Sequence, residues 1–174
     1  IARLESLGDD RPIAVHLYAP DGAEPGVRRL TVASLREYPL TQVLPVLTDL
    51  GVDVVDERPY TIRLSDGETR HVSDFGLTVA DPALWGDDAT AEAFEDAFRA
   101  VWSGAAESDT LNALVLRAGL PWRSIVILRA IGRYLRQTGS AFSVEYIDEA
   151  LIAHPRLATD LVRLFALRFD PDDG

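Results

Sequence analysis

Three histidines, His16, His71 and His154, are the side chains of this sequence best suited to proton transfer or metal binding. None has a second histidine three or four residues away, so no single helix turn presents two imidazoles. A metal site or a nucleophile–base triad would require the fold to bring distant histidines together. Because no nucleophile motif accompanies them, we expect ordinary positions in strands and at helix ends.

Two residue types are missing, and their absence excludes further chemistry. There is no cysteine, which excludes disulfides, thiolate nucleophiles and cysteine-bound metals. All 17 basic residues are arginine, which excludes a lysine Schiff base or a lysine general base. No two glycines have the G-x-G spacing of a dinucleotide-binding loop. We therefore predict no catalytic, cofactor-binding or metal-binding residue in this chain.

Neighbouring carboxylates offer a second kind of chemistry, because two nearby acids can divide the acid and base roles between them. Asp53, Asp56 and Glu57 are grouped beside Arg58. Adjacent strand residues point to opposite faces of a sheet, so these carboxylates need not face one another. We expect a solvated edge or pairing with arginine, and Pro59 favours an edge strand or a bulge.

Arg129, Arg133 and Arg136 are spaced i, i+4 and i+7, which places them on one face of a helix. One interpretation is a solvated helix face. The other is a docking face for an acidic neighbouring domain or an anionic ligand, because the guanidinium fork binds carboxylates well. The apolar residues of this segment have the spacing of core positions, and they are Trp122, Ile125, Leu128, Ile131 and Leu135.

The elements that must position these side chains differ between the two halves. The first half alternates in the strand period and predicts strands over 13–18, 27–32, 52–56, 60–64 and 70–79, with a helix over 41–50. We expect Thr41 to cap this helix, because Pro45 is tolerated only near a first turn. The turn Ser65-Asp66-Gly67 favours a tight hairpin. The order β–β–α–β–β is typical of an ACT-like or ferredoxin-like arrangement.

Beyond Asp81-Pro82 the apolar period lengthens to about 3.6 residues. Helices are predicted over 90–103, 111–118, 121–137 and 143–153, and from 155 onward. We expect Gly119 to end the second of these helices and Ser143 to cap the fourth. Trp102 lies on an apolar stripe, so we expect it to be buried. The predicted fold class is α+β: a small ACT-like or ferredoxin-like α/β domain at residues 11–81, followed by an all-α helical domain at residues 82–174.

The composition of the chain limits the kinds of partner that it can bind. The net charge of −11 repels phosphate backbones, so we expect no nucleic-acid partner. No apolar run approaches the roughly 18–20 residues that span a bilayer, and no secretion signal opens the chain. We therefore expect a cytoplasmic protein without a membrane partner. The sequence also lacks an initiator methionine, from which we expect a piece of a longer chain.

A set of motifs extends over residues 17–171. In the second half they include Phe94-Glu95-Asp96-Ala97-Phe98-Arg99-Ala100-Val101-Trp102-Ser103-Gly104, Ala118-Gly119-Leu120-Pro121-Trp122-Arg123 and Tyr134-Leu135-Arg136-Gln137. In the first half they are Leu44-Pro45-Val46-Leu47, Asp56-Glu57-Arg58-Pro59-Tyr60 and Asp74-Phe75-Gly76-Leu77. In combination they resemble the non-catalytic N-terminal region of the large bacterial NAD-specific glutamate dehydrogenases.

The resemblance implies ACT-like domains joined to helical motifs, with the dehydrogenase chemistry in a later domain. The parent enzyme would oxidatively deaminate L-glutamate to 2-oxoglutarate as a large homo-oligomer. NAD would then be a cofactor of the parent enzyme, and this segment would hold none. The partners implied are other domains and other copies of the parent chain.

ACT domains commonly bind amino acids near a loop at a domain interface, so the resemblance points to a possible amino-acid effector. The candidate loop contains Asp21, Gly22 and Gly26, and residues 35–40 are a second candidate. A plain surface turn is the alternative, because glycine and proline are turn residues first. We expect a regulatory and assembly segment; the alternative function is a structural scaffold without a ligand.

Overall fold

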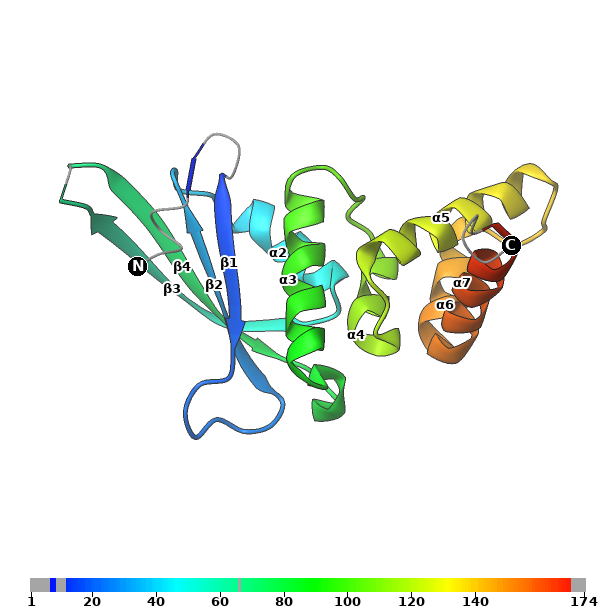
Figure 1. The fold of residues 1–174 in the computed structure, drawn as a ribbon, viewed down its shortest axis with the longest axis horizontal. Helices are drawn as coiled ribbons and strands as arrows, with labels where there is room; N and C mark the ends of the chain where they lie inside the picture. The colour runs from blue at the N-terminus through cyan, green and yellow to red at the C-terminus, as the bar shows by residue number, and fades with distance from the viewer. Residues whose placement is uncertain (1–6, 9–11, 66, 170–174) are drawn as a thin grey trace.

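The computed structural model describes residues 7–8, 12–65 and 67–169. Its first half is a four-stranded antiparallel sheet, which lies at one end of the molecule (Figure 1). The strands are β1 (Ile13–Tyr18), β2 (Val27–Ser34), β3 (Asp53–Arg63) and β4 (Thr69–Thr78), and their spatial order is β1-β2-β4-β3. Helix α2 (Leu40–Asp49) connects β2 to β3. The predicted order of strands around one helix is confirmed, and so is the α+β fold class.

The strand period assigns the two faces of this sheet. Ile13, Val15 and Leu17 of β1 are buried in the main core, whereas the side chains between them belong to the opposite face. Leu30 of β2 and Phe75 of β4 continue the same core face and are fully buried. Helix α2 contributes Val43, Val46 and Leu47 to this core. The other face is left open by these helices and carries most of the buried polar groups of the sheet.

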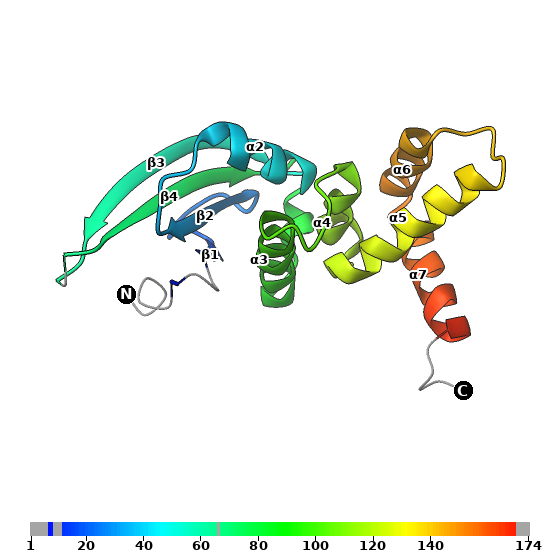
Figure 2. The ribbon, with the colours of Figure 1, turned by 90° about the horizontal axis from the view of Figure 1, so that it is seen from above.

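Helix α3 (Asp88–Trp102) protects the edge strand β1. Asp87 caps the helix by accepting a hydrogen bond from the Thr90 amide. Phe94 and Phe98 are fully buried, and the helix packs against β1, α4 and α5 (Figure 2). The carboxylate of Glu95 accepts a hydrogen bond of 2.9 Å from the Leu17 amide. An edge-strand donor that would otherwise lie open to another strand is thereby occupied.

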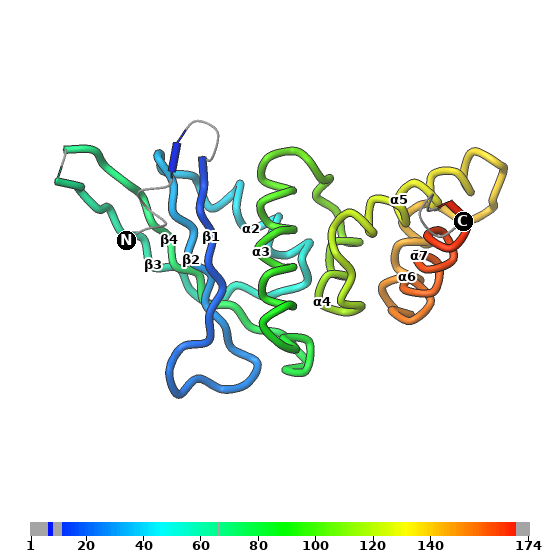
Figure 3. The backbone as a smooth tube through the Cα atoms, in the orientation of Figure 1, coloured from blue at the N-terminus to red at the C-terminus, as the bar shows by residue number. Residues whose placement is uncertain are grey.

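The second half is helical throughout its described length. After a 3-10 turn, η1 (Pro82–Trp85), and α3, the chain forms η2 (Thr110–Ala113) and four helices: α4 (Leu114–Ala118), α5 (Trp122–Gln137), α6 (Val144–Ala153) and α7 (Pro155–Phe169). Figure 3 shows the chain moving away from the sheet through α4 and α5. Gly119 ends α4 in the left-handed conformation, with a φ of 63°. Ser143 caps α6 as predicted.

One hydrophobic core connects the two halves. The same cluster of buried side chains extends from Ile13 in β1 to Ala158 in α7. Leu111 of η2 and Leu114 of α4 lie at the junction and are fully buried. Helix α2 packs against η2, which in turn packs against α5 and α6. The sheet and the helices are therefore joined by packing as well as by the chain. No helix among the described residues is both long and apolar enough to cross a membrane.

Some local predictions were wrong. Pro39, and not Thr41, occupies the N-cap of α2, where its carbonyl accepts a hydrogen bond from the Gln42 amide. Pro45 therefore lies in the second turn, and the helix tolerates it because the missing bond would have gone to a carbonyl near the exposed helix start. Leu135, predicted as a core residue, is 41% exposed near the C-terminal end of α5. Trp102 is only half-buried.

The predicted domain limits are only partly within the described residues. The boundary between residues 81 and 82 stays a prediction, and α3, which follows it, packs against β1. Residues 11 and 170–174 of the predicted domains lie outside the described residues, as does Asp66 of the predicted turn. The strands on either side of that turn do pair, with Arg63 opposite Thr69.

The predicted strands 52–56 and 60–64 are a single strand, β3, which carries a β-bulge. Val54 faces Leu77 and Asp56 faces Gly76, so Val55 is the extra residue and its side chain is 70% exposed. The bulge brings Asp56 into one row with Gly76 and Arg29, which are register partners across β4 and β2. A side chain at position 76 would meet this row, because a Cβ there would lie 2.9 Å from an Asp56 carboxylate oxygen.

Gly76→Ala should therefore displace the Asp56 carboxylate from Arg29. The hydrogen bond from Arg29 is the main cause that lowers the pKa of Asp56. We expect the pKa of Asp56 in the variant to rise towards its ordinary value, measured by NMR titration of the carboxyl carbon. Gly132→Ala is the matched control, because a Cβ there makes only ordinary contacts, at 3.7 Å or more. An unchanged Asp56 titration in Gly76→Ala would contradict this geometry.

Candidate functional site

The three histidines occupy separate positions. His16 lies in β1, where its Nδ1 is 3.3 Å from a carboxylate oxygen of Glu95. His71 is half-buried in β4, and His154 is exposed at the end of α6. Across residues 7–8, 12–65 and 67–169, no group of three or more potential metal ligands was found. The structure does not bring the histidines together into a catalytic arrangement.

One residue of the acidic cluster, Asp56, belongs to an ion-pair network on the open face of the sheet. Asp56 accepts a hydrogen bond of 2.9 Å from Arg29, and its second neighbour is Arg58 at 3.6 Å. Arg29 is itself 8% exposed, and its Nε donates to Asp74 at 2.5 Å. The hydroxyls of Tyr18 and Thr31 also donate to Asp74. Pairing with arginine thus accounts for Asp56, while Asp53 and Glu57 are not part of this network.

Sequence reasoning missed Arg29 and Asp74, the two charged residues at the centre of this network. Their side chains share a face only because β2 and β4 pair in a particular register, in which Thr31 lies opposite Asp74. The signal in the sequence was strand alternation: Arg29 and Asp74 are neighbours of the core residues Leu30 and Phe75, so they belong to the opposite face of the sheet. A charged residue that is buried on that face must find a partner.

The first candidate effector loop contains an exposed turn, and effector binding there stays a prediction. Asp21 and Gly22 are exposed, and Gly22 has a φ of 71°, which favours glycine. Gly26 is buried, and its carbonyl accepts a hydrogen bond of 3.0 Å from the indole nitrogen of Trp85. The backbone conformation thus explains the glycine at position 22 without a ligand, whereas the Trp85 contact at position 26 uses a carbonyl that any residue would offer.

The second candidate loop, residues 35–40, borders a cavity of about 440 Å³. The guanidinium of Arg36 lies over the Tyr38 ring at 4.9 Å, and Tyr38 meets Trp102 edge to face at 4.7 Å. Gln42 of α2 and Ser108 complete the polar part of the wall. The cavity therefore combines one exposed cation, two aromatic faces and neutral hydrogen-bonding groups. This composition suits a small molecule with a carboxylate.

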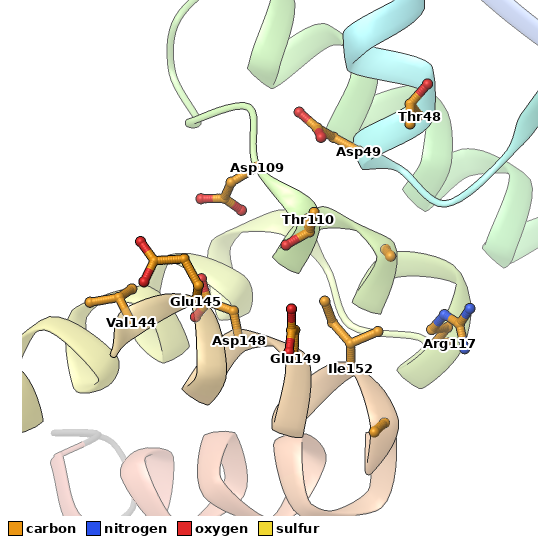
Figure 4. Close-up of a pocket in the computed structure, with 12 residues that line it drawn as sticks. Thr48, Asp49, Asp109, Thr110, Arg117, Val144, Glu145, Asp148, Glu149 and Ile152 are labelled. Atoms are coloured by element: carbon orange, nitrogen blue, oxygen red, sulfur yellow. The ribbon is translucent and has the colours of Figure 1, made fainter. Parts of the chain in front are cut away.

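A larger cleft of about 860 Å³ separates α2 from α6 (Figure 4). Carboxylates dominate its walls: Asp49 extends from α2, Asp109 precedes η2, and Glu145, Asp148 and Glu149 lie on α6. Arg117 is at one end. Burial, together with the nearby charge of Asp109, raises the pKa of Asp148 to about 6. The protonation of this cleft therefore changes in the physiological pH range.

Arg129 connects α5 to the turn that forms one wall of this cleft. It is 4% exposed, and its Nε and one terminal nitrogen donate hydrogen bonds of 2.6 and 2.8 Å to the two carboxylate oxygens of Asp109. The same terminal nitrogen donates to Asn112 at 3.0 Å. Asp109 also caps η2 by accepting from the Leu111 amide. A single buried guanidinium thus fixes the start of η2 against α5.

The other two arginines of the predicted docking face are exposed but also have partners in this chain. Arg133 donates to both carboxylate oxygens of Glu107, one of them at 2.9 Å. Arg136 donates to the carbonyl of Ser140 at 2.9 Å. Arg129 therefore lies inside the protein and is separated in role from Arg133 and Arg136. Docking of a partner by this face stays a prediction.

Fold and site together define a class of protein: a small ACT-like α/β domain packed on a helical domain. Comparison with known families agrees in both halves. Residues 12–90 match the family described as glutamate dehydrogenase, ACT3 domain, and residues 106–171 match glutamate dehydrogenase, helical motif 3. The chain therefore has the ACT3 domain and helical motif 3 of the glutamate dehydrogenase family, as its motifs predicted.

Curated relatives extend this similarity to nearly the whole chain. The chain is 39% identical to the NAD-specific glutamate dehydrogenase of Pseudomonas aeruginosa over 171 residues, which is 97% of the chain. It is 38% identical to the protein of the same name from Mycobacterium tuberculosis and 35% identical to that from Halomonas elongata, with 98% of the chain covered in both. It spans only 10–11% of the length of these relatives.

Replacing Arg129 and Arg133 separately should separate a buried ion pair from an exposed one. Arg129→Gln leaves Asp109 without its main partner, and we expect the free energy of unfolding to fall by about 3 kcal/mol. This value is at the lower end for buried ion pairs because 29% of the Asp109 side chain is exposed. Arg133→Gln removes an exposed, screened pair and should change stability little. Urea denaturation measures both; equal effects of the two variants would contradict the assigned burial.

Asp148 should make the cleft sensitive to pH. Its pKa in the folded protein is about 6, above the ordinary value of 3.8, so the folded state holds the proton more tightly than the unfolded state. This residue therefore favours folding at low pH, and its contribution is lost as the pH rises from about 4 to above 6. The stability of Asp148→Asn relative to the parent protein should increase over that interval, measured by urea denaturation. Glu149→Gln, an exposed acid of the same helix, should show no such increase.

Proposed function

We propose that the chain is a non-catalytic regulatory and assembly segment of an NAD-specific glutamate dehydrogenase. The observation that carries the proposal is the single hydrophobic core, which extends from β1 of the ACT3 domain to α7 of helical motif 3. Because packed interiors deform little, a displacement of the sheet would move α5 and α6 with it. Such a unit suits the transmission of force or of an effector signal between other parts of a large enzyme.

The residue content supports a non-catalytic role. Glutamate dehydrogenation requires a nucleotide site and a base, and the chain has neither lysine nor a G-x-G loop. The buried arginines already have carboxylate partners within the chain: Arg29 pairs with Asp56, and Arg129 pairs with Asp109. In this proposal L-glutamate, 2-oxoglutarate and NAD are handled by a different part of the parent enzyme.

We place an amino-acid effector in the cavity beside residues 35–40. Arg36 would receive the carboxylate of the effector, and Gln42 and Ser108 could bind its amino group or side chain. Trp102 of α3 lines the same cavity, and α3 packs against both β1 and α5. A bound effector would therefore contact a helix that joins the sheet to the helical half. The exposed turn of Asp21 and Gly22 is the weaker candidate, because its contacts are those of an ordinary turn.

The alternative function is a structural scaffold that binds no ligand. Ion pairs within the chain already occupy Arg129 and Arg133, and the Trp85 indole occupies the Gly26 carbonyl. These contacts favour a chain whose polar groups serve its own architecture. The two functions differ in whether the cavity at Arg36 takes up an amino acid.

Two measurements on the purified chain test the proposal. Incubation with L-glutamate and NAD should give no NADH, and turnover that persists through further purification would contradict a non-catalytic role. Calorimetric titration with glutamate and aspartate should give saturable heat that Arg36→Gln abolishes. Arg28→Gln is a matched control, because Arg28 lies over Trp85, away from this cavity. Absence of binding by the parent chain would leave the scaffold function in place.

A further inference from the structure

Residues of α5 and α7 line an apolar groove. Figure 1 shows these two helices towards the end of the molecule farthest from the sheet. The volume of the groove is about 650 Å³. Val126 and Tyr134 of α5 are 41% and 65% exposed there, and Leu164, Phe165 and Phe169 of α7 are 61%, 38% and 62% exposed. Helix α7 thus presents large apolar side chains to solvent beside the face that it buries. Contiguous exposed apolar surface of this kind marks a binding surface.

The helices that form the groove differ in charge from the rest of the chain. Together α5 and α7 carry seven arginines and a single acid, Asp160, whereas the whole chain has a net charge of −11. Two of the seven, Arg129 and Arg133, are paired with Asp109 and Glu107, so five remain to give these helices their positive surface. Arg168 itself lines the groove. An occupant with an apolar stripe flanked by carboxylates would satisfy both the apolar floor and the positive surroundings.

We infer that this groove docks an apolar, acid-flanked helix from a part of the parent chain outside these 174 residues. The inference rests on the proposed function, in which the chain is one segment of a long enzyme. The relatives are about ten times as long as the region that this chain matches, so they contain ample further surface. Docking here would join helical motif 3 to another domain, on the side opposite the sheet.

A second copy of the chain fits the groove less well. A symmetric contact of groove with groove would bring Arg168 and the other exposed arginines of α5 and α7 close to their copies in the partner, and like charges in a desolvated contact are unfavourable. A membrane surface also attracts apolar and basic helices. The groove is a concave site between two helices, which suits an inserted helix better than a flat surface.

The test compares the accessibility of the groove in the isolated chain and in the full-length enzyme that contains it. The chain has no cysteine, so Leu164→Cys introduces one thiol in the groove, and Ala166→Cys introduces one at an exposed position on the opposite side of the same helix, outside the groove lining. Maleimide labelling is followed by peptide mass spectrometry, which separates these thiols from any others in the full-length enzyme. We expect position 164 to react at least tenfold more slowly in the full-length enzyme than in the isolated chain, with a much smaller change at position 166.

Three outcomes would overturn the inference. They are equal labelling of position 164 in both proteins, protection of it in the isolated chain that grows with protein concentration, and protection of it by vesicles of phosphatidylglycerol. The second would assign the groove to another copy, and the third to a membrane. None of these outcomes depends on NADH formation, so failure of the docking inference is distinguishable from failure of the proposed function.

Discussion

The buried guanidinium of Arg129 sets the constraint on which the junction between the two halves depends. A charge withdrawn from water is tolerated only when its donors are met with good geometry, and Asp109 and Asn112 meet them. Satisfying Arg129 fixes the start of η2, and η2 places Leu111 and Leu114 in the shared core. The acidic cleft follows from the same arrangement, because Asp109 is held opposite α6.

Local chemistry explains what could be predicted from the sequence, and non-local pairing explains what could not. Ser143 begins α6 and Gly119 ends α4 through contacts within a few residues of the chain, and both helix ends were predicted correctly. The burial of Arg129 escaped prediction because helical spacing defines a face without saying what covers it. The Arg29–Asp74 pair depends in the same way on strand register, which no single strand contains.

The polar contacts of the described residues fit the regulatory and assembly role that we propose. The central ion pairs of the chain are used internally, in the sheet through Arg29 and at the junction through Arg129. The two binding surfaces that we propose lie at separate places: the cavity at Arg36 and Trp102 near the sheet, and the groove between α5 and α7 at the far end. A continuous core between them gives a physical route by which a molecule bound at one site could affect the other.

The central claim is that the ACT3 domain and helical motif 3 form one cooperative unit. Trp85 is buried beside the sheet, and Trp122 begins α5 in the helical half. Two variants, each with one of these tryptophans retained and the remaining two replaced by phenylalanine, report the two halves separately in equilibrium urea unfolding. Our account expects each fluorescence transition to coincide with the loss of helical circular dichroism in the same variant. The account would be contradicted if the Trp85 fluorescence transition came at a lower urea concentration than the loss of helical circular dichroism and the Trp122 transition at a higher one, or the reverse.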